Sequence, residues 1–449
     1  MNARTAALQI LIKVTEHGAY LSDTLRLHFK ELPDRQDRAF VSFLCTGTVK
    51  RLIEVDFRIN LYAKTKIKKM HPIVRNILRM GAYQLLYMDG VPASAAVNES
   101  VKLAKKNGQA KASGMINGIL RSMAREDKPW PFTGRKPRTA AECALVFSVP
   151  EWIAERFAGR FGLEGAKEIL SACLSPAPLT IRVNTSRIAP GELAKRLAGE
   201  GVTVKAADAA YVLENVGIVE ALASFNEGLF FVQDLSSMEP AAAAGIRPGD
   251  TVVDVCAAPG GKAMHAADIL MTQASGRDSG DAADRGMAPE RSQAAGLVIA
   301  RDVSEAKVAK IRENIDRAGF TNIRAEVWDA RVFDERMAGK ADVVIADLPC
   351  SGLGVLKRKP EIKFRVTEDD IALLSRLQQE ILDTVCEYVT DGGKLVYSTC
   401  TLTEEENEGN VRRFLEAHKD FSLISEKTIL PDALRDGFFV AVLKRYGKN

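Results

Sequence analysis

The chain has 449 residues, more than one ordinary hydrophobic core holds, so we expect two or three domains. Hydrophobic residues make up 46% of the chain and charged residues 27%, as in soluble globular proteins. No apolar run approaches the roughly 18 residues that a membrane span needs, and the first residues lack the apolar core of a signal peptide. These features exclude membrane-embedded and secreted proteins and predict a cytoplasmic location with no membrane partner.

The charge is distributed unevenly along the chain. Residues 1–130 contain 22 Lys and Arg against 11 Asp and Glu, a formal charge of +11, while the whole chain carries +4. The rest of the chain is therefore mildly acidic. A basic N-terminal third indicates a polyanionic partner, most simply nucleic acid, although charge alone favours a solvated helical surface equally.

The seven cysteines are an odd number without a CxxC pair, and the five histidines form no HxxxH or HExxH motif. This pattern indicates free thiols in a reducing compartment, and it favours neither a disulfide framework nor a zinc site. We therefore expect no bound metal. Cys45, Cys173 and Cys386 occupy helical stripes, where a small core residue is the ordinary role.

Residues 1–128 have the pattern of helices only. Val74, Ile77, Leu78, Gly81 and Leu85 repeat at helical spacing, and similar stripes lie before and after them, with basic clusters such as residues 64–69 between. This region resembles the NusB family of small all-helical RNA-binding domains. The resemblance implies that residues 1–128 form a helical RNA-binding domain.

Residues 129–235 predict linker helices followed by a small α+β module. A polar, Pro-containing stretch at 128–138 marks the linker, and residues 150–175 have a helical pattern. Residues 179–184, 202–204 and 229–232 are strand candidates, and 191–198 a helix candidate. We expect this module to contribute to RNA binding.

Residues 236–449 alternate between strands and helices, which predicts an α/β fold with a doubly wound parallel sheet. The strand candidates are 251–256, 297–301, 323–327, 342–346 and 394–398, and 438–443 indicates a late hairpin arm. Three helix starts are marked by cap signals: Ser304, Thr367 with Asp370, and Thr403 with Glu406. Residues 271–296 are polar and aperiodic, which indicates a mobile surface insertion without a chemical role.

A glycine-containing loop follows the first of these strands and opens a helix. Such a loop lets a ligand approach the free N–H groups of the helix, which favour an anionic group. It matches neither GxGxxG nor GxxxxGK[ST], so S-adenosylmethionine is the remaining common ligand, with an ordinary Gly-Gly turn as the alternative. The loop residues expected to bind the cofactor are Cys256, Ala257, Ala258, Pro259, Gly260, Gly261 and Lys262.

Acidic residues at the ends of later strands extend the expected cofactor site. Asp302 follows a strand at the position where a carboxylate binds both ribose hydroxyls. Asp329 is expected to receive the adenine amino group, and Asp347 completes the set. A solvated loop acid is the alternative for Asp302 and Asp329, and Arg301 directly before Asp302 departs from the expected pattern.

Two cysteines, Cys350 after Asp347-Leu348-Pro349 and Cys400 after Ser398-Thr399, end strand-like runs. In one parallel sheet both thiols would open at the carboxyl edge, where ligands bind. A thiolate that adds to carbon 6 of a pyrimidine makes carbon 5 nucleophilic, which is covalent catalysis. Asp347 is placed to share a proton with ring nitrogen N3 and so stabilise the adduct. The Pro-Pro-aromatic triplet typical of exocyclic-nitrogen methylation is absent.

The stretches 182–185, 256–262, 347–352 and 398–400 resemble the RNA cytosine-C5 methyltransferase family, and the NusB-like N-terminus is similar to its Sun/RsmB type. The resemblance implies S-adenosylmethionine as cofactor, and 16S rRNA or a partly assembled small ribosomal subunit as partner of a monomer; it suggests cytosine 967 as the target. It also implies that Cys400 is the nucleophile and that Cys350 assists product release. DNA cytosine-C5 enzymes use the Pro-Cys cysteine as nucleophile instead. Lys262 is expected to hold the catalytic aspartate or the target base.

Two other functions stay open. A tRNA cytosine-C5 methyltransferase would use the same residues, and an RNA-binding assembly factor would carry an inactive catalytic domain. The complete set Asp347, Cys350 and Cys400 argues against the inactive form. The basic residues that follow Cys350 favour phosphate contacts over a solvated loop, and these are Lys357, Arg358, Lys359, Lys363 and Arg365.

Overall fold

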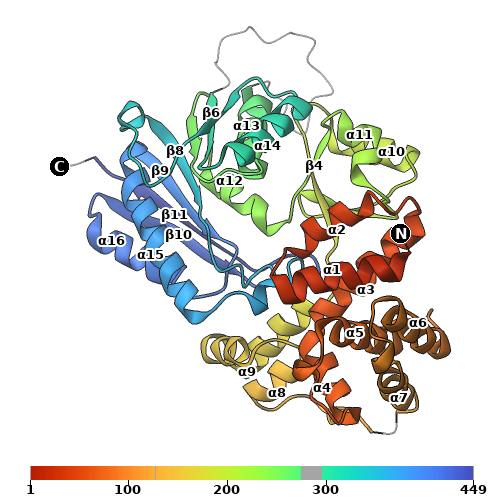
Figure 1. Cartoon of the computed structure of the whole chain (residues 1–449). Coiled ribbons are helices and arrows are strands. Elements are labelled where there is room, and N and C mark those ends of the chain that lie inside the picture. The colour runs from red at the N-terminus through yellow and green to blue at the C-terminus, as the bar shows by residue number, and fades with distance from the viewer. Residues whose placement is uncertain (1, 127, 275–295, 448–449) are drawn as a thin grey trace. The chain divides into compact units, whose positions relative to one another are not determined.

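The computed structural model describes residues 2–126, 128–274 and 296–447. The chain divides into two units, which are described separately (Figure 1). The first comprises Met1–Pro176 and Leu356–Arg365, and the second Ala177–Val355 and Val366–Asn449. The first unit thus includes the linker helices that the sequence analysis grouped with the α+β module, together with a segment from the C-terminal half of the chain.

The first unit is helical, as predicted. Its centre is α5 (Pro72–Tyr87), which packs against α1, α3, α4, α6 and α7 through its buried stripe. A Cβ atom at Gly81 would lie 2.6 Å from the side chain of Leu120, so glycine permits this close approach. No helix in the described ranges is long and apolar enough to cross a membrane. The remaining helices are α1 (Ala3–His17), α2 (Leu21–Phe29), α3 (Arg35–Lys50), α4 (Leu52–Tyr62), α6 (Ala93–Lys106), α7 (Ser113–Ala124), α8 (Ala140–Val146) and α9 (Glu151–Leu174).

The second unit begins with a four-stranded antiparallel sheet of order β2-β3-β1-β4. The predicted strands are present, but β3 was missed. It pairs with β2 across a two-residue turn at which Asp208 has φ 51°. The elements are β1 (Leu179–Val183), α10 (Pro190–Gly199), β2 (Thr203–Ala207), β3 (Ala210–Glu214), α11 (Ala223–Asn226) and β4 (Phe230–Val232).

A seven-stranded sheet of order β10-β11-β9-β8-β5-β6-β7 follows, and it confirms the predicted α/β fold. Strands β5 to β9 are parallel, whereas β10 and β11 form the antiparallel hairpin arm. One apolar core contains side chains of α12, α13 and α14, and the other those of α15 and α16. The strands are β5 (Thr251–Asp254), β6 (Leu297–Asp302), β7 (Ile323–Val327), β8 (Ala341–Asp347), β9 (Val389–Thr399), β10 (Phe421–Ile429) and β11 (Phe438–Arg445). The helices are α12 (Glu239–Ala244), α13 (Gly261–Ala274), α14 (Glu305–Ala318), α15 (Glu368–Val385) and α16 (Glu408–Ala417).

Two predicted boundaries are wrong. Helix α13 continues through Ala274, so the predicted insertion does not begin at Met271; its residues 275–295 lie outside the described chain. The capping pair at Thr367 and Asp370 is present, whereas α16 begins at Glu408 and not after Thr403. Glu406 therefore does not cap this helix in the way that the sequence predicted.

A buried ion pair joins the small sheet to the large one. Arg182 on β1 donates to Asp268 on α13 over 2.8 Å, and the two side chains are only 5% and 3% exposed. Asp268 also accepts the backbone N–H groups of Thr185 and Ser186, at 3.1 and 2.8 Å. Burial lowers the pKa of Arg182 to about 10, against the attraction of Asp268. The motif at 182–185 thus fixes the helix that follows the glycine loop.

Replacing one member of this pair should destabilise the second unit strongly. Arg182→Ala leaves the carboxylate of Asp268 buried without its cation, which typically costs about 3–5 kcal/mol. The exposed pair of Arg196 and Glu227 provides the control, because Arg196→Ala should cost less than about 1 kcal/mol. Urea unfolding of both variants measures the difference. Equal losses for the two variants would contradict the structural role of the buried pair.

Candidate functional site

The carboxyl edge of the large sheet gathers most of the residues singled out in the sequence. Parallel strands β5, β6, β8 and β9 end at Asp254, Asp302, Asp347 and Thr399 respectively. The glycine loop leaves β5, and the Pro-Cys and Thr-Cys segments leave the adjacent strands β8 and β9. Both predicted cysteines therefore lie at one edge.

The glycine loop is held by the end of β6. The N–H of Ala257 donates to the carbonyl of Arg301 at 2.8 Å, and the N–H of Ala258 to the carboxylate of Asp302 at 3.3 Å. Gly260 has φ 107°, a conformation that favours glycine, and α13 begins at the next residue. Asp302 is 4% exposed and also contacts Lys307 at 3.2 Å. The loop and Asp302 thus form one hydrogen-bonded group.

Asp254 lies at the base of this loop and is fully buried. Burial raises the pKa of its carboxyl group to about 7, opposed by nearby Lys262 and reinforced by Asp347 and Asp302. Among the described residues, no side chain hydrogen-bonds to either of its oxygens. A buried carboxyl group without a side-chain partner is costly, so this position points to a ligand.

Asp329 and Arg301 have local partners. Asp329 accepts the guanidinium of Arg331 at 2.6 and 3.1 Å, and hydrogen bonds from Arg331 lower its pKa. Arg301 is 2% exposed and pairs with Asp334 at 2.6 Å and Glu326 at 2.9 Å. The side chain of Arg301 is thereby fixed by ion pairs while its carbonyl supports the loop. Arg301 directly before Asp302, which departs from the expected pattern, therefore does not disrupt the glycine loop.

Lys262 pairs with Asp347, one of the two partners that the sequence predicted for it. The ammonium nitrogen lies 2.6 Å from the carboxylate, and Ser398 donates to the other oxygen at 2.8 Å. Burial acts to lower the pKa of Lys262, but the attraction of Asp347 outweighs it and the pKa is raised. The carboxylate is thus fixed from β9 and α13 simultaneously.

The two sulfur atoms of Cys350 and Cys400 lie 3.3 Å apart, within hydrogen-bonding distance. Both residues are partly exposed, whereas Cys45, Cys173 and Cys386 are buried core residues, as predicted. The pKa of Cys350 lies well above its usual value, first because of the hydrogen bond with Cys400 and then because of burial. Negative charge on Glu406 and Asp347 raises it further. These contacts disfavour a thiolate on Cys350.

Glu406 is a site residue that sequence reasoning missed. Its buried carboxylate accepts the N–H of Ser351 at 2.8 Å, the hydroxyl of Ser351 at 2.5 Å and the hydroxyl of Thr403 at 2.7 Å. Ser351 directly follows Cys350, and Thr403 lies three residues after Cys400. One carboxylate thus connects the two cysteine segments. This role is not predicted from the sequence, because the Thr-x-x-Glu spacing also indicates a helix cap.

Gln378 on α15 hydrogen-bonds both to the segment that carries Cys350 and to Glu406. It donates to the carbonyl of Pro349 at 2.8 Å and to Glu406 at 3.1 Å. The hydroxyl of Tyr397 and the amide of Asn410 both donate to the Gln378 side-chain oxygen, at 3.1 and 2.7 Å. The side chains of Gln378, Tyr397, Glu406 and Asn410 are fully buried, so they form a rigid polar network beneath the cysteine segments.

The predicted phosphate contacts after Cys350 are wrong for two residues. Lys357 and Lys363 are 1% and 3% exposed and belong to the helical unit. Lys363 donates to the carbonyl of Lys50 at 2.6 Å, and Glu361 accepts the N–H of Leu21 at 3.0 Å. Within the described ranges, no cluster of three or more possible metal ligands occurs.

Known proteins resemble the chain along its whole length. Family models match residues 1–125 (NusB family), 149–218 (ferredoxin-like domain of RsmF/B-like methyltransferases) and 289–444 (16S rRNA methyltransferase RsmB/F). The probable ribosomal RNA small subunit methyltransferase B of Bacillus subtilis is 33% identical over 471 residues, 99% of both chains. The crystal structure of PH0851 has a TM-score of 0.79 at 24% identity over 99% of each chain. A methyltransferase homologue from Pyrococcus horikoshii has a TM-score of 0.57 at 28% identity, over 69% of this chain and 100% of its own. The resemblance seen in the motifs is confirmed, and the chain belongs to the RsmB/F family of 16S rRNA methyltransferases.

Proposed function

We propose that this protein transfers a methyl group from S-adenosylmethionine to carbon 5 of a cytosine in 16S rRNA, through a covalent bond between Cys400 and carbon 6. The observation that carries the proposal is the pair of sulfur atoms 3.3 Å apart at the carboxyl edge of the sheet. Asp347, with its ion pair to Lys262, lies at the end of the same β8 strand that leads to Cys350. Few reactions need two thiols and a carboxyl group together.

The residues of the glycine loop fit the cofactor. Asp254 has a buried carboxyl group to which no described side chain hydrogen-bonds. Gly260, with φ 107°, lets the backbone turn directly before the N-terminus of α13. We assign the loop from Cys256 to Lys262 and the carboxylates of Asp302, Asp329 and Asp347 to cofactor binding. When bound, S-adenosylmethionine supplies an electrophilic methyl group on its sulfonium.

We assign the attack on carbon 6 to Cys400. We place the proton of the shared hydrogen bond on Cys350, whose pKa is raised, so that this bond stabilises a thiolate on Cys400. The ammonium of Lys262 attracts the same negative charge. The new sulfur–carbon bond moves an electron pair toward ring nitrogen N3, where Asp347 shares a proton and stabilises the adduct.

We assign product release to Cys350. After methylation, carbon 5 must lose its proton, and the electron pair left behind expels the Cys400 sulfur. As the Cys400 sulfur leaves as a thiolate it takes the proton of Cys350 across the 3.3 Å between them, and the Cys350 sulfur takes the proton of carbon 5. Glu406 and Gln378 hold its loop and therefore act as positioning residues.

Several observations support 16S rRNA as the substrate. The curated relative from Bacillus subtilis is named for the small-subunit ribosomal RNA, and it aligns with 99% of this chain. The N-terminal region is basic and matches the NusB family. The target cytosine, the monomeric state and the cytoplasmic location stay predictions. A tRNA substrate is distinguished by comparing methyl incorporation into 16S transcripts and tRNA.

Removing each thiol should affect the covalent adduct in opposite ways. Cys350→Ala should accumulate a protein–RNA adduct stable to denaturing gel electrophoresis, because attack continues while release is impaired. Cys400→Ala should abolish both adduct and methylation. Cys143→Ala, which removes a buried thiol of the helical unit, should behave like the unchanged protein. If Cys400→Ala traps RNA and Cys350→Ala does not, the two roles are reversed.

Weakening the Glu406 network should slow release rather than binding. Glu406→Gln removes one acceptor and the charge from bonds to Ser351 and Thr403. A loss of about 1.5–3 kcal/mol of such bonding lowers kcat by roughly 10- to 100-fold. KM for RNA should change little, and the adduct fraction should rise.

The neighbouring Glu404 is exposed, so Glu404→Gln serves as the matched control and should leave kcat unchanged. A fall in melting temperature of Glu406→Gln with kcat per folded molecule intact would show that the network only stabilises the fold.

A further inference from the structure

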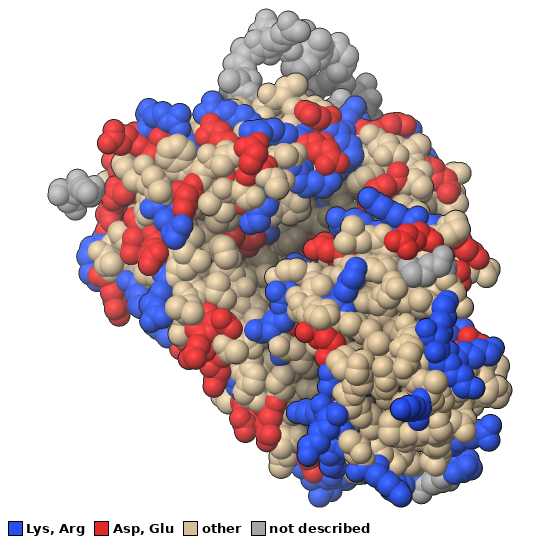
Figure 2. All heavy atoms as spheres, in the orientation of Figure 1, with Lys and Arg blue, Asp and Glu red and all other residues tan. Residues whose placement is uncertain are grey.

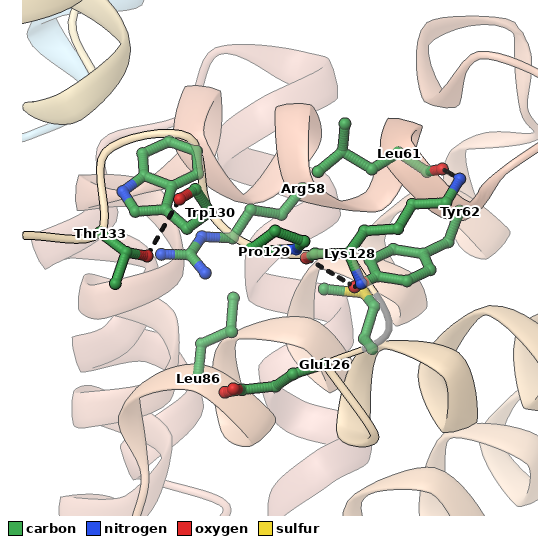
Figure 3. Close-up of a pocket in the computed structure, with 10 residues that line it drawn as sticks. Arg58, Leu61, Tyr62, Leu86, Glu126, Lys128, Pro129, Trp130 and Thr133 are labelled. Carbon is green, nitrogen blue, oxygen red and sulfur yellow. Dashed lines mark hydrogen bonds between the residues drawn. The ribbon is translucent and has the colours of Figure 1, made fainter.

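We propose that a cavity in the helical unit binds one unstacked nucleotide of the RNA, outside the catalytic site. The cavity has a volume of about 340 Å³ and lies between α4, α5, α7, Glu126 and residues 128–133 (Figure 3). This is near the lower end of the roughly 300–1,000 Å³ typical of small-ligand sites, which suits a single nucleoside. The proposal names a substrate contact and so rests on the proposed function.

The lining combines an apolar floor with two aromatic rings. Leu61, Leu86 and Met123 contribute apolar side chains, and Tyr62 and Trp130 contribute the rings. Single-stranded RNA is recognised by stacking its unpaired bases on such rings. An RNA base also buries its apolar faces while keeping polar edges, which matches a cavity of mixed lining.

The edges of the cavity carry polar groups suited to a nucleotide. Arg58 and Lys128 are cationic, and Glu126 and Thr133 offer a carboxylate and a hydroxyl. In Figure 3 the guanidinium of Arg58 lies between Trp130 and the side chains of Leu86 and Glu126. A cation beside the rings attracts a phosphate, and a carboxylate accepts an exocyclic amino group of a base. The Lys128 ammonium donates to the carbonyl of Leu61, and the Thr133 hydroxyl donates to that of Trp130 at 2.9 Å, so both side chains are held at the cavity.

The cavity walls are already ordered. The Trp130 ring packs edge-on against Phe57, with 5.7 Å between centroids, and Arg58 lies 4.3 Å from the Trp130 centroid. The hydroxyl of Tyr62 accepts the N–H of Lys128 at 3.0 Å and donates to its carbonyl at 3.1 Å. Arg58 is anchored by the buried carboxylate of Glu54 at 2.9 Å. Binding to such a site costs little ordering entropy.

The surroundings are cationic. Lys64, Lys66, Lys68 and Lys69 follow the end of α4 directly and are all exposed. Figure 2 shows Lys and Arg side chains gathered over the helical unit with few acidic residues among them. Phosphates on either side of a bound nucleotide would contact these lysines. The lysines attract RNA of any sequence, and the cavity adds one contact at a fixed position.

The test measures RNA affinity of the full chain without cofactor. The probe is a fluorescein-labelled, unstructured RNA dodecamer of mixed sequence, followed by fluorescence anisotropy. Loss of one base–aromatic stack should weaken binding by about 10-fold or more for Trp130→Ala. Trp130→Leu, which keeps apolar packing but removes the ring, should lose as much. Trp130→Phe should stay within about 2-fold.

The control is Phe43→Ala, which removes an aromatic ring 54% exposed on α3 of the same unit and should leave affinity unchanged. Melting temperatures confirm that each variant is folded. Crosslinking of 4-thiouridine RNA should map to Tyr62 or Trp130. Equal affinities for folded Trp130→Leu and the unchanged protein, or crosslinks confined to other segments, would overturn the proposal.

Binding and methylation are measured separately, so the two proposals fail separately. If Trp130→Leu weakens RNA binding while 16S transcripts accept no methyl group, the cavity is a nucleotide site and the proposed function is wrong. If methylation occurs and its KM for RNA is unaffected by Trp130→Leu, the cavity is not part of substrate recognition.

Discussion

The buried carboxylate of Glu406 is the contact on which the arrangement of the two thiols depends. Strands β8 and β9 bring Cys350 and Cys400 to the same edge, but each cysteine lies in an irregular segment beyond its strand. Such segments need their backbone groups satisfied, and Glu406 accepts from Ser351 in one segment and Thr403 in the other. Ser351 and Thr401 also share a hydrogen bond of 2.7 Å, and the N–H of Gly354 donates to the carbonyl of Cys400 at 3.0 Å; together with Glu406 these contacts hold the sulfur atoms 3.3 Å apart.

Around this contact the charges are ordered so that the two thiols differ. The hydrogen bond with Cys400, burial and acidic neighbours raise the pKa of Cys350, while Lys262 interacts electrostatically with Cys400. Lys262 also neutralises Asp347 over 2.6 Å. Its position follows from α13, which the buried pair of Arg182 and Asp268 fixes to the small sheet.

The sequence predicted those parts of the fold and site that depend on local pattern. Apolar runs alternating with helical segments predicted the strands of the large sheet, and the glycine loop, Asp302, Asp347 and both cysteines followed from their positions at strand ends. Glu406 was misassigned because Thr-x-x-Glu also satisfies a helix cap, and only tertiary packing decides between the two uses. Lys357 and Lys363 were misassigned because the helices that bury them lie some 300 residues away in sequence, as the bond from Lys363 to Lys50 shows (313 residues apart). Strand β3, as long as the predicted β1 and β2, was missed because the Ala-rich stretch before it has no glycine or proline to signal a turn.

In its C-terminal half the chain passes from the second unit into the helical unit and back again. Residues Leu356–Arg365 leave the second unit five residues after Cys350 and fold as part of the first. Burial there lowers the pKa of Lys363 to about 7, so its ammonium depends on the carbonyl of Lys50 as a partner. Removing the N-terminal helices would expose this segment and leave Glu361 and Lys363 without the partners they bond. The helical unit is therefore not a separable appendage, because the chain that follows Cys350 continues into it.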